Sequence, residues 1–462
     1  MEQTLNKRYG LMVAIAMVVG IVVGSGVFFK AEKILNATGG DLPLGIIAWV
    51  IGGLIMVACA YTFAIMATKY EKVNGVVDYA EATLGPRYGY LLGWFMAVIY
   101  YPSLVAVLAW ISARYTCVLF NWDIAGGECL ALAAFYLVLS YALNVLSPVL
   151  SGKFQVSATV IKLVPLLLMA VVGTIVGLAN GMTVKNFTEV VTVSDQPSVN
   201  LLFTAVVATA FAYEGWIIAT SINAELRDAK KNLPRALLFG TLIVMAVYIL
   251  YYIGLAGAVP NETMMAGGES GAKLAFETVF SQGAGVVLFV FVVISCLGTL
   301  NGLMLGGVRG IYALSARGEG PRPDVFASID KSTNMPTNSG ILGLLLSAVW
   351  LLYFFGAIIT TISGNAPWFG PFSFDTSELP IVTIYALYIP IFIMMMRKER
   401  DLGAFKRFVM PILAIIGCVF MIIAACFAHR MAVVYYLIVF AVVMVIGWAL
   451  RRGRSKAPVA AK

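Results

Sequence analysis

The chain has 462 residues, of which 61% are hydrophobic and only 12% are charged, and its formal net charge is +8. Soluble proteins are about 45–50% apolar and about 25% charged, so a soluble chain with this composition would expose large apolar patches. The composition argues against a soluble enzyme, a nucleic-acid-binding protein and a disordered chain. It is typical of an integral membrane protein with many spans.

Twelve apolar runs are long enough to cross a bilayer as helices, which takes about 20 residues each. In chain order they cover roughly residues 10–35, 42–69, 88–120, 127–149, 154–178, 200–224, 235–259, 285–314, 339–359, 379–396, 408–428 and 431–450. They are too continuous for the short alternating strands of a β-barrel. The sequence therefore predicts an all-α polytopic membrane protein with 12 transmembrane helices, in which residues 1–462 form one transmembrane domain.

The basic residues predict the orientation of these helices. If the N-terminus lies inside the cell, inner segments hold 24 of the 31 Lys and Arg residues, and outer segments hold six, including Lys30 and Lys33. The remaining one, Lys162, falls inside a run. Because membrane proteins retain Lys and Arg on the cytoplasmic side, we expect both termini in the cytoplasm. We expect a multi-pass protein of the plasma membrane that contacts lipid and binds no nucleic acid.

The first run contains a cluster of glycines, Gly20, Gly24 and Gly26, with Ser25 between the last two. Glycine adopts non-helical dihedral angles without a Cβ clash, so this cluster is a candidate helix break. The alternative is close packing, because small residues line the contacts between membrane helices.

The sixth run contains a second candidate break in the segment Phe211-Ala-Tyr-Glu-Gly-Trp216. A carboxylate such as Glu214 within a span is costly in lipid and indicates a functional site. The two interruptions lie 189 residues apart, and each falls in the first helix of a five-helix unit.

Corresponding breaks in two halves of a chain are typical of transport proteins built from inverted repeats. We therefore expect a five-plus-five inverted repeat with broken first and sixth helices. The first repeat covers about residues 10–178 and the second about 200–396, and extra helices cover about 408–450.

The ends of broken helices present free main-chain groups. The half-helix that starts after Ser25 offers N–H groups and partial positive charge, which suit a carboxylate. The half-helices that end before Gly24 and near Phe211 offer carbonyl groups, which suit an ammonium group. A zwitterionic amino acid carries both groups. The predicted binding residues are Val22, Val23, Gly24, Ser25, Gly26, Val27, Phe211, Ala212, Glu214 and Gly215.

Lys162 places a cation among apolar residues of the fifth run. One interpretation is that its side chain reaches the membrane surface. The other is a fixed cation at the place of a coupling sodium ion, bonded to carbonyls of the first break and to hydroxyls such as Ser295 or Thr299. The titratable amine leaves a role in proton coupling open.

Four motifs resemble the L-amino acid transporter family of the amino acid–polyamine–organocation superfamily. They cover residues 24–28, 74–94, 211–236 and 295–302, and the resemblance extends over about residues 10–410. It implies the five-plus-five fold and main-chain recognition of substrate. It also implies that Phe211 closes over the substrate from outside and that Lys162 matches a lysine of sodium-independent members.

The resemblance implies alternating-access exchange of small neutral L-amino acids of the alanine, serine and cysteine type, without sodium and without a cofactor. A proton-coupled amino acid symporter is the alternative. Glu214 departs from several animal relatives, which have glycine there. The loop 121–127 lacks the cysteine that links animal members to a heavy-chain glycoprotein, so we expect no such subunit.

Other functional classes have little support. A membrane-embedded enzyme needs titratable or metal-binding clusters within its spans, whereas the single histidine, His429, lies at the edge of an outer loop. We therefore expect neither an enzyme nor a metal site. A channel needs a selectivity filter, and no filter-like loop stands out. Glu225, where the sixth run meets the cytoplasm, is either an inner-gate residue or a solvated helix end.

Overall fold

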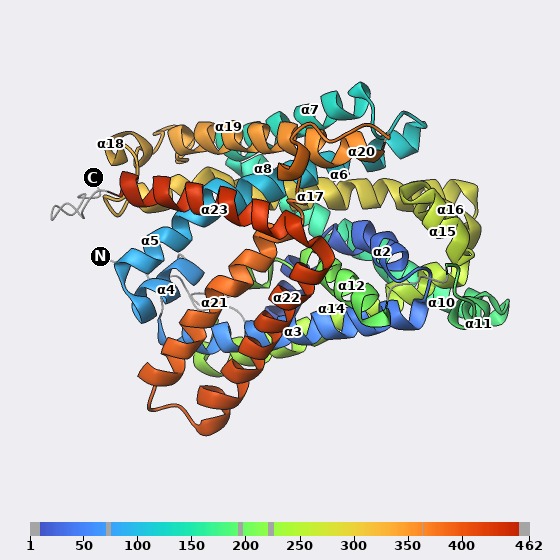
Figure 1. Cartoon of the computed structure of the whole chain (residues 1–462), viewed down its shortest axis with the longest axis horizontal. Helices are drawn as coiled ribbons and strands as arrows, with labels where there is room; N and C mark the ends of the chain where they lie inside the picture. Colours follow the sequence, from blue (N-terminus) through green and yellow to red (C-terminus); the bar gives the residue numbers. More distant parts are fainter. Residues whose placement is uncertain (1–9, 71–74, 193–196, 220–225, 363, 452–462) are drawn as a thin grey trace. The chain divides into compact units, whose positions relative to one another are not determined.

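The computed structural model describes residues 10–70, 75–192, 197–219, 226–362 and 364–451, which are mainly helical (Figure 1). The α-helices are α1 (Leu11–Val22), α2 (Gly26–Ala37), α3 (Leu42–Lys69), α4 (Val76–Leu84), α5 (Pro86–Phe95), α6 (Tyr101–Phe120), α7 (Gly127–Leu146), α8 (Pro148–Ile161), α9 (Leu163–Leu168), α10 (Thr174–Ala179), α11 (Met182–Thr188), α12 (Ser198–Ala212), α13 (Trp216–Ala219), α14 (Ala229–Ala258), α15 (Asn261–Gly267), α16 (Glu269–Phe280), α17 (Gln282–Ser315), α18 (Pro323–Phe326), α19 (Thr337–Phe354), α20 (Thr360–Ile362), α21 (Leu379–Lys398), α22 (Met410–His429) and α23 (Met431–Leu450). Short π-helical turns adjoin several of them, including η2 (Met169–Gly173).

Within the described residues, ten helical stretches are long and apolar enough to cross a membrane. Two further apolar helices are shorter, Leu11–Gly20 and Ser198–Ala212, and they lie in the predicted first and sixth runs. These two runs are each divided into two helical pieces, which accounts for their shorter helices. The prediction of an all-α polytopic membrane protein is confirmed, whereas the number of 12 spans and the inverted repeat stay predictions.

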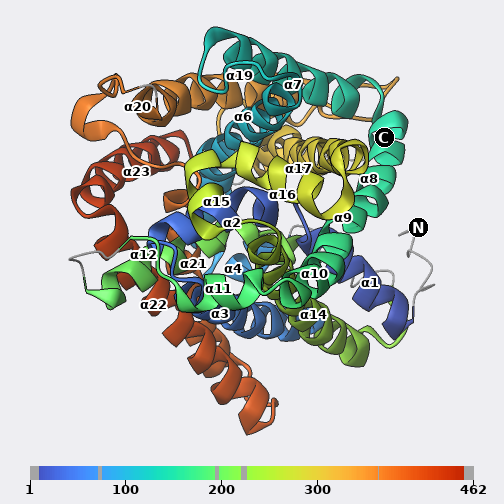
Figure 2. The ribbon, with the colours of Figure 1, turned by 90° about the vertical axis from the view of Figure 1, so that its right-hand side faces the viewer.

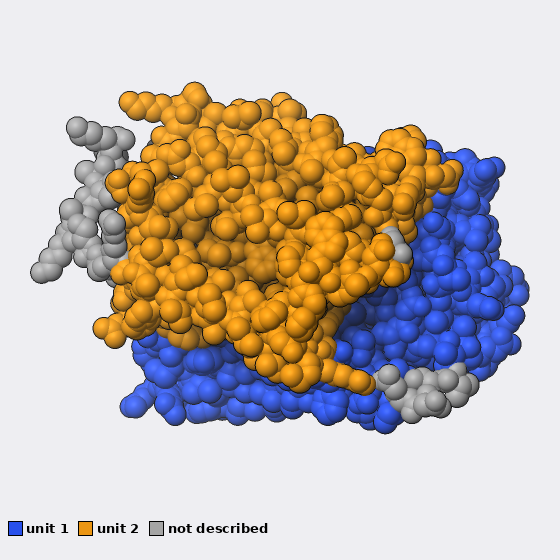
Figure 3. Space-filling model, turned by 45° about the horizontal axis from the view of Figure 1, so that its top comes forward, with its two compact units in different colours: residues 1–84, 159–295, 381–428 blue, residues 85–158, 296–380, 429–462 orange. Residues whose placement is uncertain are grey.

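The chain forms two compact units (Figure 3). Unit 1 contains Met1–Leu84, Thr159–Ser295 and Ile381–Ala428, and unit 2 contains Gly85–Ala158, Cys296–Pro380 and His429–Lys462. Each unit combines segments from both predicted repeats. All the predicted binding residues belong to unit 1, together with Lys162 and Ser295, whereas Thr299 belongs to unit 2.

Unit 1 is organised around α14, which packs against α1, α3 and the π-turn η2. Glycines allow the closest approach: a Cβ atom on Gly173 would lie 2.6 Å from the carbonyl oxygen of Gly254. Helix α12 packs against α2, and the two lie side by side in Figure 1. Helix α15 covers part of α2 (Figure 2). The predicted site therefore lies among tightly packed helices of one unit.

In unit 2, side chains of α5 form hydrogen bonds with main-chain carbonyls of α23. The Tyr90 hydroxyl donates to the Gly447 carbonyl at 2.9 Å, and the Trp94 indole donates to the Val443 carbonyl at the same distance. An ion pair of 3.0 Å joins Arg451 to the buried Glu319. These contacts fix the carboxyl-terminal half of α23 within unit 2.

Candidate functional site

The first predicted break is present between α1 and α2. Helix α1 ends at Val22, Val23 is extended with φ −63° and ψ 108°, and α2 begins at Gly26. The end of a helix leaves its last carbonyl groups without intrahelical donors, and the start of the next helix leaves its first N–H groups without acceptors. A buried break therefore needs other partners for its main-chain groups.

Tyr248 of α14 supplies two of these partners. Its hydroxyl donates to the Val22 carbonyl at 3.3 Å and accepts from the Gly24 N–H at 3.4 Å. The side chain is fully buried. Sequence reasoning missed Tyr248, because one tyrosine in an apolar run carries no local signal that it reaches a break more than 220 residues away.

Lys162 supplies a third partner. Its ammonium group donates to the Gly20 carbonyl at 2.8 Å, and the residue is only 4% exposed. In an uninterrupted helix this carbonyl would accept from the N–H of Gly24, which here donates to Tyr248 instead. Lys162 lies between α8 and α9, and its side chain is buried against α1 of unit 1. The coupling roles of Ser295 and Thr299 stay predictions.

The second predicted break is present between α12 and α13. Helix α12 ends at Ala212, and the N–H of Tyr213 still bonds to the Thr209 carbonyl at 3.0 Å. The main chain then leaves helical geometry at Gly215, whose φ is +105°. Residues with a side chain rarely adopt this backbone conformation. A glycine is therefore required here by the backbone.

The two breaks meet in space. A Cβ atom built on Gly26 would lie 2.5 Å from the Cα of Ala212 and 3.0 Å from the carbonyl oxygen of Phe211. The amino end of α2 thus touches the carboxyl end of α12, which brings partial positive and partial negative helix poles together. Packing against α12 is what excludes a side chain at Gly26, so the glycine is needed even without a ligand.

A cluster of aromatic side chains contacts both breaks. Tyr213 stacks on Tyr248 with ring centroids 5.3 Å apart, and its hydroxyl donates to the Trp49 carbonyl at 2.9 Å. The Trp49 ring contacts both tyrosines edge to face, at 5.5 and 5.6 Å. A movement of either break therefore changes contacts of the other.

Phe211 and Glu214 have different surroundings. The Phe211 ring is 8% exposed and packs edge to face against Phe29 of α2, with centroids 5.9 Å apart. Glu214 is half-buried and lies within electrostatic reach of Cys59 in α3 and of Tyr385 and Tyr388 in α21. The carboxylate of Glu214 therefore faces other helices of unit 1.

The other predicted binding residues lie at the two breaks and differ in burial. Val22, Val23, Ser25, Val27 and Ala212 are buried, and Gly24 and Gly215 are half-buried. Within the part of the chain that the structure describes, no group of three or more His, Cys, Asp or Glu residues could hold a metal ion. Glu225, the candidate inner-gate residue, lies outside the described residues.

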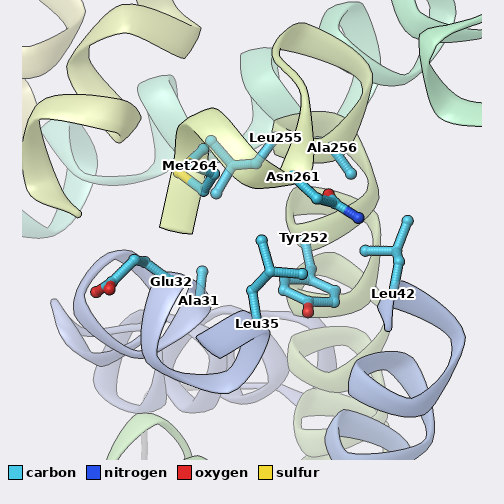
Figure 4. Close-up of a pocket in the computed structure, with 9 residues that line it drawn as sticks. All are labelled: Ala31, Glu32, Leu35, Leu42, Tyr252, Leu255, Ala256, Asn261 and Met264. Carbon is cyan, nitrogen blue, oxygen red and sulfur yellow. The ribbon is translucent and has the colours of Figure 1, made fainter. Parts of the chain in front are cut away.

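A small pocket lies beside α2, next to α14 and α15 (Figure 4). Figure 4 shows mostly apolar side chains around it, with the Tyr252 hydroxyl and the Asn261 amide as polar groups and the Glu32 carboxylate turned away. Its lining residues are Ala31, Glu32, Leu35, Leu42, Tyr252, Leu255, Ala256, Asn261 and Met264. None of the predicted binding residues lines it.

Several known proteins are similar to this chain in sequence. The chain is 28% identical over 431 residues to the serine/threonine exchanger SteT of Bacillus subtilis (strain 168), and the match covers 91% of both chains. It is 28% identical to the b(0,+)-type amino acid transporter 1 of Mus musculus, over 91% of this chain and 83% of the relative. It is 29% identical to the large neutral amino acids transporter small subunit 2 of Homo sapiens, over 70% of this chain and 60% of the relative.

These relatives are transporters, not enzymes. The sequence model of one family, described as amino acid permease, matches residues 9–449, which is nearly the whole chain. The chain belongs to the amino acid permease family.

Proposed function

We propose that this protein exchanges small neutral L-amino acids, such as alanine, serine and cysteine, across the plasma membrane without sodium. Both termini lie in the cytoplasm, as the distribution of basic residues predicts. Residues 1–462 form one transmembrane domain of 12 transmembrane helices with a five-plus-five inverted repeat. The protein works without a heavy-chain subunit, because the loop 121–127 has no cysteine for such a link.

The observation that carries this proposal is the contact between the two helix breaks at Gly26 and Ala212. The amino end of α2 binds the substrate carboxylate, and carbonyls at the ends of α1 and α12 bind the substrate ammonium group. This recognition uses only the groups common to all α-amino acids. Side-chain size is then the main basis of selection, with Phe211 closing the site from outside.

Lys162 takes the place of a coupling sodium ion. Its ammonium group already bonds to the Gly20 carbonyl at the end of α1, which is the kind of oxygen ligand that an alkali cation would use. A cation that belongs to the protein at this position lets the first break reorganise without binding sodium. The name of SteT, a serine/threonine exchanger, supports exchange and a small hydroxylated substrate.

The test is uptake of radiolabelled alanine into proteoliposomes in sodium-free buffer without a pH gradient. Vesicles are either empty or loaded with unlabelled alanine. We expect uptake only into loaded vesicles. Unlabelled serine and cysteine should compete with labelled alanine, whereas leucine and phenylalanine should compete weakly.

Other outcomes lead to different functions. Uptake into empty vesicles contradicts obligatory exchange, and dependence on an imposed pH gradient favours the proton-coupled symporter. Stronger competition by large than by small amino acids contradicts the proposed substrate size. Stimulation by sodium contradicts the proposed role of Lys162.

A further inference from the structure

Lys30 of α2 is a fully buried lysine, with an exposed fraction of 0%. The distribution of basic residues predicts an outer segment for Lys30. An ammonium group taken out of water is costly unless other groups compensate for its lost hydration. A buried cation that is retained in a transport protein is a candidate for a functional role.

Lys30 lies on the face of α2 that contacts the second break. It follows Gly26 by four residues, and residues spaced by three or four share one helix face. Because Gly26 contacts the main chain of Ala212, this face is turned toward α12. The opposite face carries Ala31 and Leu35, which line the separate pocket of Figure 4.

The ammonium group of Lys30 lies against the aromatic ring proposed to close the site. It lies 5.2 Å from the ring centroid of Phe29 and 5.5 Å from that of Phe211. Cations at this distance are attracted by the electrons of an aromatic face. Phe29 also contacts the ammonium group of Lys33 at 4.4 Å, whereas Phe211 contacts that of Lys30.

We propose that Lys30 is a specificity-determining residue that excludes amino acids with cationic side chains and holds the Phe211 ring in place. This inference rests on the proposed amino acid site at the two breaks. At 1.5 Å per residue, the Cα atom of Lys30 lies about 6 Å along α2 from that of Gly26, and its ammonium group lies against the Phe211 ring. A substrate with a second ammonium group brings a like charge into this poorly hydrated interior, where repulsion between like charges is strong.

The test compares competition by a neutral and a cationic amino acid of small size. Exchange of labelled alanine is measured in alanine-loaded proteoliposomes with increasing serine or L-2,4-diaminobutyrate. We expect the wild-type protein to bind diaminobutyrate at least about tenfold more weakly than serine. The Lys30→Met variant keeps the length of the side chain without its charge, and it should abolish most of this difference.

Two further variants separate charge from structure. Lys30→Arg keeps the cation and its contact with aromatic rings, so it should discriminate as the wild type does. Lys33→Met removes the neighbouring cation that contacts Phe29, and it should also discriminate normally. For Lys30→Met we expect the KM for alanine to rise by no more than about threefold, because main-chain recognition is retained.

Several results would overturn the inference. Unchanged discrimination in folded Lys30→Met contradicts it, as does an equal loss in Lys33→Met. Equal competition by serine and diaminobutyrate in the wild type contradicts it without any variant, so the inference stays testable if Lys30→Met does not fold. If the wild-type protein shows no exchange, the proposed function itself is contradicted. This outcome differs from a failure of the inference about Lys30, which appears as lost or unchanged discrimination between serine and diaminobutyrate.

Discussion

Buried hydrogen-bonding groups are arranged differently at the helix breaks of unit 1 and in a polar cluster of unit 2. At the breaks, the polar groups belong mainly to the main chain, and single side chains such as Tyr248 and Lys162 bond to some of them. The cluster of unit 2 consists of side chains on three unbroken helices: Asn144 of α7, Ser151 of α8 and Asn301 of α17.

The unit 2 cluster bonds within itself. The Asn144 amide donates to the side-chain oxygen of Asn301 at 3.0 Å and to its carbonyl at 3.1 Å. Ser151 donates to Asn144 at 3.1 Å, and the Asn301 amide donates to Ser151 at 3.0 Å and to Gln155 at 3.2 Å. Networks of this kind hold helices rigidly, because each broken bond leaves a buried group without a partner.

The two regions differ in whether their polar groups can bind a substrate. Main-chain groups at helix ends can bind a substrate, and they lie in a region whose conformation depends on a few contacts. Side-chain groups that bond to one another lock α7, α8 and α17 together within unit 2. We therefore expect substitutions at the breaks to change transport and substitutions in the cluster to change stability.

The largest expected effect is that of Gly26→Val. The two methyl groups cannot fit where even a Cβ atom would lie 2.5 Å from the Cα of Ala212. The breaks are forced apart, and a displacement of this size is expected to lower exchange at least about 100-fold. Overpacking should also reduce the free energy of unfolding by about 1–3 kcal/mol. Alanine exchange and thermal unfolding measure the two effects.

The matched control for this prediction is Gly152→Ala. A Cβ atom on Gly152 in α8 would have no neighbouring atom within 4 Å, so exchange should be unchanged. The Gly26→Ala variant should lie between the two. Normal exchange in Gly26→Val would contradict the close contact of the breaks.

Lys162→Ala is expected to have the next largest effect. It leaves the buried Gly20 carbonyl without its charged donor, and hydrogen bonds to charged groups contribute about 1.5–3 kcal/mol. We expect exchange to fall at least about tenfold, with no more than modest activation by sodium. The control is Lys153→Ala, which changes an exposed lysine of α8. Unchanged exchange in Lys162→Ala would remove this residue from the mechanism.

Tyr248→Phe removes the hydroxyl group at the first break and keeps the ring that stacks on Tyr213. The loss of two neutral hydrogen bonds is expected to lower exchange about tenfold. Tyr252→Phe is the comparison, because that ring also packs against Trp49 but lines the small pocket instead. Equal effects of the two variants would contradict a specific role of the Tyr248 hydroxyl at the first break.

Phe211→Ala should weaken apparent affinity more than turnover. The ring packs against Phe29, and without it the site closes incompletely, so we expect the KM for alanine to rise about fivefold. Phe203→Ala, earlier in α12, removes a ring that packs against Phe420 instead and should leave the KM unchanged. Wild-type kinetics in Phe211→Ala would place the closing residue elsewhere.

The smallest effect on exchange is expected for Asn301→Ala in unit 2. It breaks the buried cluster and should reduce the free energy of unfolding by about 1–3 kcal/mol, which thermal unfolding will show as a lower Tm. Exchange by the folded fraction should stay within about twofold of wild type, since the helix ends are intact. A changed KM with unchanged stability would contradict the expectation that the cluster of unit 2 affects stability and the breaks affect transport.

The helical architecture could be predicted largely from the sequence. Hydrophobic length is a local property, so runs such as 431–450 correspond closely to α23. The two breaks were also predictable, because Gly24 and Gly215 are residues that favour a departure from helical geometry within an apolar run. The pairing of the breaks followed from their matching positions in two halves of the chain.

The partners of the broken helices were only partly predictable. A buried cation such as Lys162 is unusual enough to attract attention, and its bond to the first break agrees with the prediction. Tyr248 and Asn301 are ordinary residues for their positions, so only the fold identifies the groups to which they bond. The burial of Lys30 could not be predicted, because a lysine near the end of an apolar run gives no local signal that other helices cover it.

The sequence by itself determined the membrane-spanning helices, their breaks and the family, because hydrophobicity, glycine and short motifs act over a few neighbouring residues. The tertiary structure decided which side chains complete the breaks and which cation lies against the Phe211 ring. Those contacts join residues far apart in the chain, and they depend on the direction of each helix face. Hydrogen bonds and close packing are therefore established only when the helices pack together.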